Sequence, residues 1–167
     1  MTMSAALELK QLLTRRPALT LAVAESLTAG HVQAQVASVS GASDYFLGGV
    51  TAYSLDEKVK LLGVNRTHAR AVDCVSQRVV VEMAAGVVKL FNADLGVATT
   101  GYAEPAPKQK VKLPQAWWAL CHRYRGGAAM ILSGFVEVLD ADRITVQTRV
   151  AEVVLGELVK YLREIRG

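Results

Sequence analysis

An α/β fold is predicted for this chain: a single three-layer α/β/α domain, residues 1–167, with a mixed sheet covered by helices on both faces. The length of 167 residues and the 51% hydrophobic content suit one hydrophobic core. Over the first part of the chain, apolar β-prone runs alternate with amphipathic helical patterns, as in parallel strands joined by helices. Two later apolar runs flank a glycine pair, which indicates a hairpin before a last helix.

A helix, a strand and a second helix are expected at the N-terminus. Leu9, Leu12 and Leu13 share one helical face, and Pro17 ends that helix. A strand is expected over residues 19–24. The second helix should open near Ser26 and break at residues 41–43, with an apolar face made of Val32, Val36 and Val39.

Two serines mark the next helix starts. A strand over residues 50–53 follows two glycines and leads into the capping box of Ser54 and Glu57, which predicts a short helix to about Leu62 that Gly63 ends. Ser76 caps a long amphipathic helix, whose apolar residues are Val80, Met83, Val87 and Phe91.

Three strands and a helix complete the expected fold. The strands cover residues 93–99, 115–121 and 129–138, and a turn around residues 125–127 joins the last two. The C-terminal helix should start near Arg143 or Val146, and it should bury the apolar residues Val146, Val150, Val153, Leu158 and Leu162.

Composition argues against several classes of protein. The formal charge is +4, but the Lys and Arg residues are dispersed and few aromatics accompany them, so no nucleic-acid partner is expected. The apolar runs are shorter than the roughly 20 residues of a membrane span, and no signal-peptide pattern is visible, so we expect a cytoplasmic protein without a membrane partner. Cys74 and Cys121 form no CxxC pair and are expected to be reduced.

No metal or cofactor is expected either. His31, His68 and His122 lie in different predicted elements and lack the spacing of a ligand set. The sequence contains neither the GxxxxGK[ST] phosphate loop nor the GxGxxG fingerprint of dinucleotide-binding folds.

Ser26 is a candidate nucleophile because it occupies a predicted strand-to-helix turn. Such a turn places a hydroxyl beside the free N–H groups and the positive dipole end of a helix, where an oxyanion or phosphate is stabilised. The alternative is a helix N-cap with no chemical role.

Lys58 is a candidate base for Ser26. The capping box places its ammonium in the first helical turn, where the dipole disfavours a cation and lowers the pKa, and a desolvated lysine can then deprotonate a serine. The alternative is a solvated lysine paired with Asp56 or Glu57.

Further hydroxyls are expected at the same edge of the sheet. Tyr53 ends the strand before the helix of Lys58, and Thr99, Thr100 and Gly101 end another strand. Ligands of α/β domains usually bind beyond the carboxyl ends of the strands. A purely structural role at strand ends and turns is the alternative for each of them.

These residues together resemble the CinA C-terminal domain family, whose characterised members are nicotinamide-mononucleotide amidases (PncC). Residues 24–30, AESLTAG, resemble the family signature A-E-S-C-T-G-G. Residues 41–64 resemble its G-S-S-x-x-F-x-G-G-V-x-x-Y-S-x-x-x-K-x-x-L-G-V block, and CVSQ at 74–77 resembles A-V-S-E. Asp142-Arg143 is similar to the G-D-R that opens the family's last helix.

The resemblance implies a function and a set of site residues. Ser26 matches the nucleophile, Lys58 the base, and Tyr53 a further catalytic position. The implied reaction is metal-free, cofactor-free deamidation of nicotinamide mononucleotide or a related pyridine nucleotide, the partner is that small-molecule nucleotide, and a homo-oligomer is possible. The implied substrate-binding residues are Thr28, Gly30, Thr100, Gly101 and Arg143.

The sequence also departs from the family pattern. Leu27 and Ala29 replace a cysteine and a glycine, and residues 101–107 (GYAEPAP) replace the glycine-rich G-I-A-G-P-x-G-G segment. The new Glu104 should repel a phosphate, so we expect weak amidase activity on nicotinamide mononucleotide, although nearby lysines could restore phosphate binding. The alternative function is a catalytically degenerate CinA-like paralogue that binds a ligand or self-associates.

Overall fold

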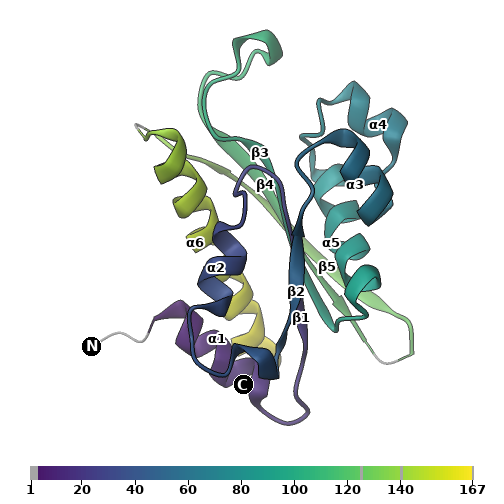
Figure 1. Cartoon of the computed structure of the whole chain (residues 1–167), viewed down its shortest axis with the longest axis vertical. Coiled ribbons are helices and arrows are strands. Elements are labelled where there is room, and N and C mark those ends of the chain that lie inside the picture. Colours follow the sequence, from purple (N-terminus) through teal and green to yellow (C-terminus); the bar gives the residue numbers. More distant parts are fainter. Residues whose placement is uncertain (1–3, 125, 140, 167) are drawn as a thin grey trace.

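The computed structural model describes residues 4–124, 126–139 and 141–166 and contains a five-stranded sheet in the order β2-β1-β3-β4-β5 (Figure 1). β1 pairs in parallel with β2 and β3, whereas the β3–β4 and β4–β5 pairs are antiparallel. The predicted mixed sheet is therefore confirmed. Its strands are β1 (Leu21–Glu25), β2 (Phe46–Thr51), β3 (Leu95–Tyr102), β4 (Gln115–Arg123) and β5 (Ala129–Glu137).

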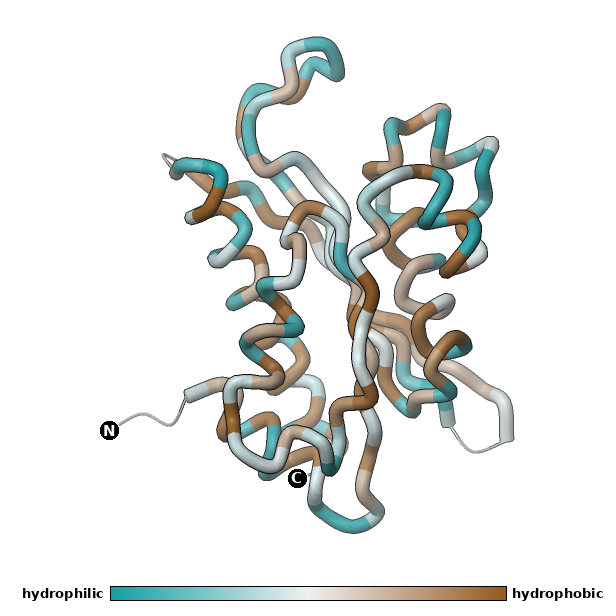
Figure 2. The backbone as a smooth tube through the Cα atoms, in the orientation of Figure 1, coloured by the Kyte–Doolittle hydropathy of each residue, from teal (hydrophilic) through white to brown (hydrophobic). Residues whose placement is uncertain are grey.

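Helices cover both faces of the sheet, which confirms the predicted three layers (Figure 1). Each helical layer buries its own cluster of apolar side chains, and hydrophobic segments follow the strands and the helices beside them (Figure 2). One layer contains α1 (Ala5–Thr14), α2 (His31–Ala37) and α6 (Arg143–Arg166). The other contains α3 (Leu55–Leu62), α4 (Arg66–Ala71) and α5 (Gln77–Phe91).

The predicted serine caps begin α3 and α5. Ser54 Oγ accepts a hydrogen bond from the Glu57 N–H at 3.3 Å, and Ser76 Oγ accepts one from the Val79 N–H at 3.2 Å. Gly63 then ends α3 with a φ of 68°, a left-handed conformation that favours glycine. Local capping chemistry therefore sets where Lys58 falls on its helix.

Two element boundaries near Ser26 and Tyr53 differ from the sequence prediction. α2 begins at His31 instead of near Ser26, which lies in the preceding turn. β2 is Phe46–Thr51 instead of 50–53, so Tyr53 follows the strand and does not end it. The two glycines expected to precede this strand lie inside it. Gly49 must be glycine there, because a Cβ would lie 2.6 Å from the Val23 carbonyl oxygen of the neighbouring strand β1.

Other differences lie further from Ser26. α4 was not expected from the sequence, and β3 begins at Leu95 and continues past Thr99 to Tyr102. Val153, which was expected to be buried in α6, is exposed. The buried face of α6 contains Val150 and Val154, which are four residues apart, and Val153 lies outside that face. In the expected hairpin turn, Arg125 lies outside the described residues.

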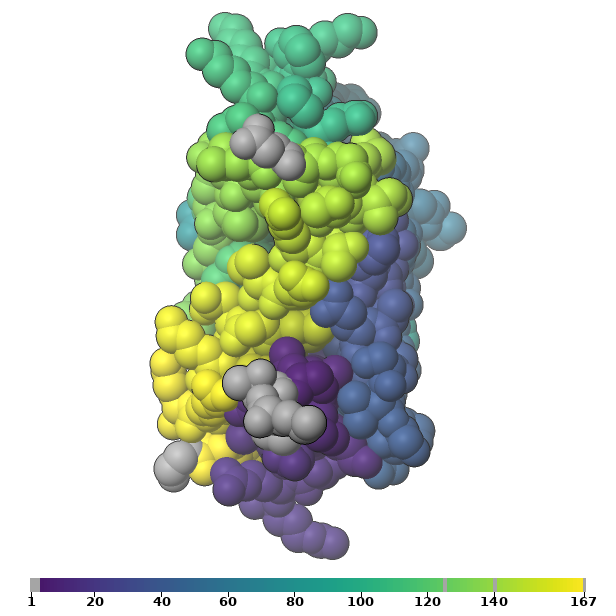
Figure 3. Space-filling view, turned by 90° about the vertical axis from the view of Figure 1, so that its left-hand side faces the viewer, coloured from purple at the N-terminus to yellow at the C-terminus, as the bar shows by residue number. Residues whose placement is uncertain are grey.

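β3 and β4 are joined by an arm, residues 103–114, that projects beyond the rest of the protein (Figures 1 and 3). The arm contains a short 3-10 helix, η2 (Pro107–Gln109), and a bridge between Ala106 and Val111. Its three lysines, Lys108, Lys110 and Lys112, are exposed, as expected for a basic, solvent-facing segment. A second 3-10 helix, η1 (Ala42–Asp44), precedes β2.

None of the helices within the described ranges combines the length and the apolar character needed to cross a membrane.

Candidate active site

Ser26 lies where β1 leaves the sheet. Its backbone N–H donates to the Thr99 carbonyl of β3 at 3.1 Å, which extends the β1–β3 pairing by one residue. The side chain is buried, with the residue 7% exposed. Thr28, in the turn that follows Ser26, is hydrogen-bonded through its hydroxyl to the Thr99 hydroxyl of β3 at 2.7 Å. The position of Ser26 is therefore fixed by the end of the sheet.

Lys58 reaches Ser26 from the first turn of α3. Its Nζ donates to Ser26 Oγ at 2.9 Å, to the Ala52 carbonyl at 2.8 Å and to the Tyr53 carbonyl at 3.1 Å. The residue is only 1% exposed, so the alternative of a solvated lysine paired with a neighbouring carboxylate is wrong.

Burial lowers the pKa of Lys58, with Cys74 and Asp73 acting in the opposite direction. The three acceptors can be satisfied by an ammonium, and also by a neutral amine whose two N–H groups donate to the two carbonyls while its lone pair accepts the Ser26 hydroxyl proton. Such a pair can act as a nucleophile and its base.

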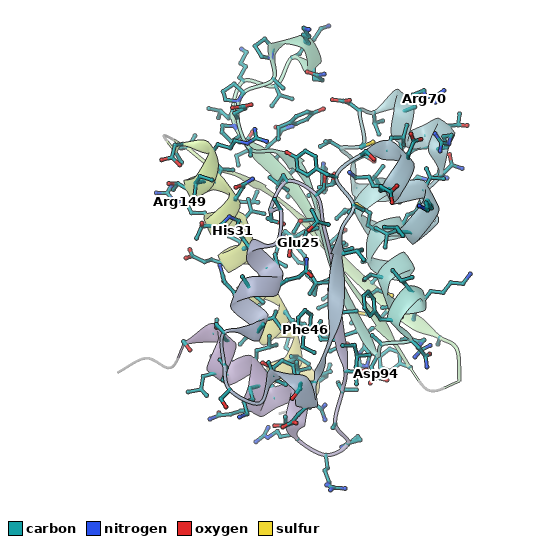
Figure 4. The ribbon with its side chains drawn as sticks, in the orientation of Figure 1. Glu25, His31, Phe46, Arg70, Asp94 and Arg149 are labelled. Atoms are coloured by element: carbon teal, nitrogen blue, oxygen red, sulfur yellow. The ribbon has the colours of Figure 1, made fainter. Side chains whose placement is uncertain are left out.

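Glu25, which the sequence analysis did not select, occupies the N-terminus of α2. Its carboxylate accepts hydrogen bonds from the N–H groups of Gly30 at 3.0 Å, Val32 at 3.1 Å and Gln33 at 2.9 Å. The residue is fully buried beside the start of α2 (Figure 4). These N–H groups are therefore unavailable to an oxyanion or phosphate, contrary to our expectation. An acidic residue shortly before a helix was the signal that could have revealed this cap.

Gly101 provides a different hydrogen-bond donor. Because the Thr99 carbonyl faces β1, strand alternation turns the peptide groups of Gly101 toward the same side, and β1 ends before it can pair with them. The Gly101 N–H therefore points into the space beyond β1, next to Ser26. A Cβ on Gly101 would lie 2.2 Å from the Gln115 carbonyl oxygen of β4, which explains the glycine.

Two adjoining pockets open at this edge of the sheet. The inner pocket, about 260 Å³, is lined by Ser26 and Lys58 among others, and the outer pocket, about 160 Å³, by Glu104 and Arg143 among others. Leu27, Tyr53, Gly101 and Tyr102 line both. Larger cavities of about 510 and 680 Å³ lie elsewhere and include neither Ser26 nor Lys58, so size does not locate the chemistry here.

Tyr53, Arg143 and Glu104 form a chain of side chains in the outer pocket. Arg143, the first residue of α6, donates to the Tyr53 hydroxyl at 2.7 Å and to the Glu104 carboxylate at 2.9 Å. Tyr53 is 54% exposed. Its phenol is thus bound to Arg143, whereas its carbonyl holds Lys58.

The remaining predicted substrate-binding residues are placed differently. Thr100 and Gly101 line the inner pocket, but the Thr100 hydroxyl donates to the Cys74 carbonyl at 2.7 Å. Thr28 and Gly30 are not among the lining residues of the two pockets. The Thr28 hydroxyl is hydrogen-bonded to Thr99 of β3, and the Gly30 N–H donates to Glu25.

Asp73 and Cys74 also line the inner pocket, where neither was expected from the sequence. Both have positive φ values, 50° and 61°, in the connection between α4 and α5. Burial raises the pKa of the Cys74 thiol, although Lys58 opposes the shift. No group of three or more His, Cys, Asp or Glu residues in the described ranges is arranged to hold a metal ion.

Sequence comparison relates the chain to one family. The CinA C-terminal domain model matches residues 3–162. A CinA-like protein from Picosynechococcus is 38% identical over 153 residues, which cover 86% of this chain and 34% of that protein. A CinA-like protein from Thermotoga neapolitana is 39% identical over 146 residues, 87% of this chain and 34% of that protein. The chain thus spans about a third of the length of the curated relatives it matches.

Solved structures share the fold. A competence-damaged protein (CinA) superfamily protein from Klebsiella pneumoniae superposes with a TM-score of 0.86 at 23% identity, over 96% of each chain. A competence damage-inducible protein A from Klebsiella pneumoniae subsp. pneumoniae gives a TM-score of 0.84 at 25% identity, over 95% of each chain. The family model covers nearly all of the sequence and the folds agree, so this chain belongs to the CinA C-terminal domain family.

Proposed function

We propose that this protein is an amidohydrolase that deamidates nicotinamide mononucleotide or a related pyridine compound through a metal-free serine-lysine mechanism. The proposal rests on the distance of 2.9 Å between Ser26 Oγ and Lys58 Nζ, which is buried and donates to two backbone carbonyls. The resemblance of the surrounding motifs to nicotinamide-mononucleotide amidases supplies the substrate class.

The first half of the reaction forms an acyl-enzyme. Ser26 Oγ attacks the carboxamide carbon while its proton passes to Lys58 Nζ. The negative charge that develops on the carbonyl oxygen is stabilised by the Gly101 N–H, because the Ala29, Gly30 and His31 amides of the turn after Ser26 already donate within the protein. Collapse of the tetrahedral intermediate breaks the C–N bond, and Lys58 returns the proton so that ammonia leaves.

The second half regenerates the enzyme. Water attacks the ester carbon, Lys58 takes a proton from that water, and the same proton is returned to Ser26 Oγ as the ester bond breaks. The products are ammonia and a pyridine carboxylate, which for nicotinamide mononucleotide is nicotinic acid mononucleotide.

The test measures ammonia release from nicotinamide, its riboside and its mononucleotide. Ser26→Ala should reduce the rate on the best substrate at least about 1000-fold, because the nucleophile is lost. Ser43→Ala is the matched control, since Ser43 is exposed and lies outside both pockets. Undiminished hydrolysis by Ser26→Ala, or no hydrolysis of any of these amides by the wild type, would contradict the proposal.

A non-catalytic, ligand-binding or self-associating CinA-like protein is the second candidate. One observation favours self-association: β5 is an edge strand of the sheet with exposed Ile131, Leu132 and Phe135, and apolar edge strands tend to pair. Light scattering would report a homo-oligomer, and its loss in Phe135→Lys would assign the contact to this strand.

A further inference from the structure

The outer pocket contains an ion pair on Arg143, the cation that the family resemblance implies for substrate binding. The Arg143 guanidinium donates to the Glu104 carboxylate at 2.9 Å and to the Tyr53 hydroxyl at 2.7 Å. Glu104 extends from the arm, so the anionic partner of Arg143 is supplied by the protein itself. A phosphate entering the outer pocket would compete with Glu104 for Arg143 and would be repelled by its carboxylate.

The charged residues that line the two pockets also disfavour an anionic substrate. Their charged lining residues are Lys58, Asp73, Glu104 and Arg143. When Lys58 is neutral, as a base must be, two carboxylates face one guanidinium. The arm lysines, Lys108, Lys110 and Lys112, are exposed and do not line either pocket, so solvent screens their charges more than those of the lining residues. The field at the site therefore favours a cation over an anion.

We propose that Glu104 is a specificity-determining residue that restricts this site to cationic carboxamides without a phosphate group, of which a pyridinium nucleoside is the model. The proposal rests on the proposed amidohydrolase function for the reaction and deepens it by naming the substrate class. A phosphate monoester adds a charge of about −1.5 to −2 at pH 7, so a mononucleotide is anionic overall while the corresponding riboside is a cation.

The test compares nicotinamide riboside with nicotinamide mononucleotide. The wild type should hydrolyse the riboside with a kcat/KM at least about tenfold higher than that for the mononucleotide. Glu104→Gln keeps the size of the side chain and removes its charge, so it should lower this ratio about fivefold or more. A wild-type preference for the mononucleotide, or an unchanged ratio in Glu104→Gln, would overturn the proposal.

Asp56→Asn is the matched control for loss of an exposed carboxylate. Asp56 pairs with Arg66 at 2.6 Å, as Glu104 pairs with Arg143, but it does not line either pocket. Its substitution should leave the riboside-to-mononucleotide ratio unchanged. An equal change in Asp56→Asn would show that the effect comes from net charge and not from the outer pocket, which also overturns the proposal.

A binding measurement separates this proposal from the proposed function. Calorimetry on Ser26→Ala should show tighter binding of the riboside than of the mononucleotide. In the double variant with Ser26→Ala and Glu104→Gln, the two dissociation constants should lie closer together. If the wild type hydrolyses no amide but this binding preference is present, the proposed reaction fails and the specificity assignment stands. Equal binding of the two ligands, or binding of neither, overturns the assignment itself.

Discussion

The inner and outer pockets differ in what holds their polar groups. Lys58, 1% exposed, is fixed by two backbone carbonyls, whereas the side chains of Arg143 and Glu104 are 44% and 65% exposed and hold one another. Backbone carbonyls move only with the fold, while an exposed ion pair typically contributes only about 0–1 kcal/mol. The reacting groups thus lie in the rigid inner pocket. The residues that select the substrate lie in the outer pocket, where a single substitution can change specificity most easily.

Removing the inner-pocket base should have the largest effect. Lys58→Met keeps a long, flexible side chain but cannot accept the Ser26 proton, so ammonia release should fall at least about 1000-fold. Thermal unfolding checks that the variant is folded. A folded Lys58→Met protein that retains a tenth of wild-type activity would remove Lys58 from the mechanism.

The Glu25 cap supports the turn that presents Ser26. Glu25→Gln replaces one of the two acceptor oxygens with a donor NH₂ group, which leaves at least one α2 N–H without a partner and should cost about 1–3 kcal/mol in the free energy of unfolding. Urea unfolding measures the change, with Glu137→Gln, at an exposed strand end, as control. A loss below about 0.5 kcal/mol would mean that the three hydrogen bonds contribute little.

The buried lysine should also make activity and stability depend on pH. Burial lowers the pKa of Lys58 from its usual value of 10.5, so the neutral base, and with it kcat/KM, should increase as the pH rises through that lowered pKa. Between the folded and unfolded pKa values the unfolded chain binds more protons, so the free energy of unfolding should rise with pH in that interval. Urea titrations at several pH values measure the slope, which Lys58→Met should flatten; an unchanged slope would contradict this assignment.

Substitutions in the outer pocket should act more weakly. Tyr53→Phe removes the hydroxyl that accepts from Arg143 but keeps the backbone carbonyl that holds Lys58. We expect KM to rise a few-fold with kcat nearly unchanged, because only positioning of the substrate is affected. Steady-state kinetics on the best substrate separate the two constants. A hundredfold fall in kcat would instead place the phenol among the catalytic groups.

A chelator should have no effect at all. The mechanism uses only Ser26, Lys58 and backbone donors, so ammonia release should be the same before and after treatment with EDTA. Loss of activity in EDTA and its recovery with a divalent cation would contradict the serine-lysine mechanism.

Sequence patterns were most informative where local chemistry decides the structure. Ser54 and Ser76 begin helices because their hydroxyls cap nearby N–H groups, which any reader of the sequence can anticipate. The α/β class followed from the alternation of strands and helices. By contrast, Gly48 and Gly49 were expected to precede a strand. Only the tertiary structure shows that they lie inside it, where Gly48 is close to Phe91 and Gly49 to the β1 backbone.

The candidate site was predictable only in part. The residues Ser26 and Lys58 came from two local turns and a family resemblance, but the two carbonyls that hold Lys58 depend on how the chain leaves β2. The role of Glu25 depends on α2 starting five residues later than expected. Asp73 and Cys74 enter the inner pocket through left-handed backbone conformations that no sequence signal marks.

The capped start of α2 has a consequence for how the protein responds to ligands. In folds where a phosphate completes a helix terminus, the helix N–H groups become ordered when the ligand arrives. Here the carboxylate of Glu25 is covalently part of the chain, so the amides of Gly30, Val32 and Gln33 are protected with or without a ligand. Their hydrogen exchange and NMR chemical shifts should stay constant on substrate addition, and the response should concentrate at Tyr53, Gly101 and the arm.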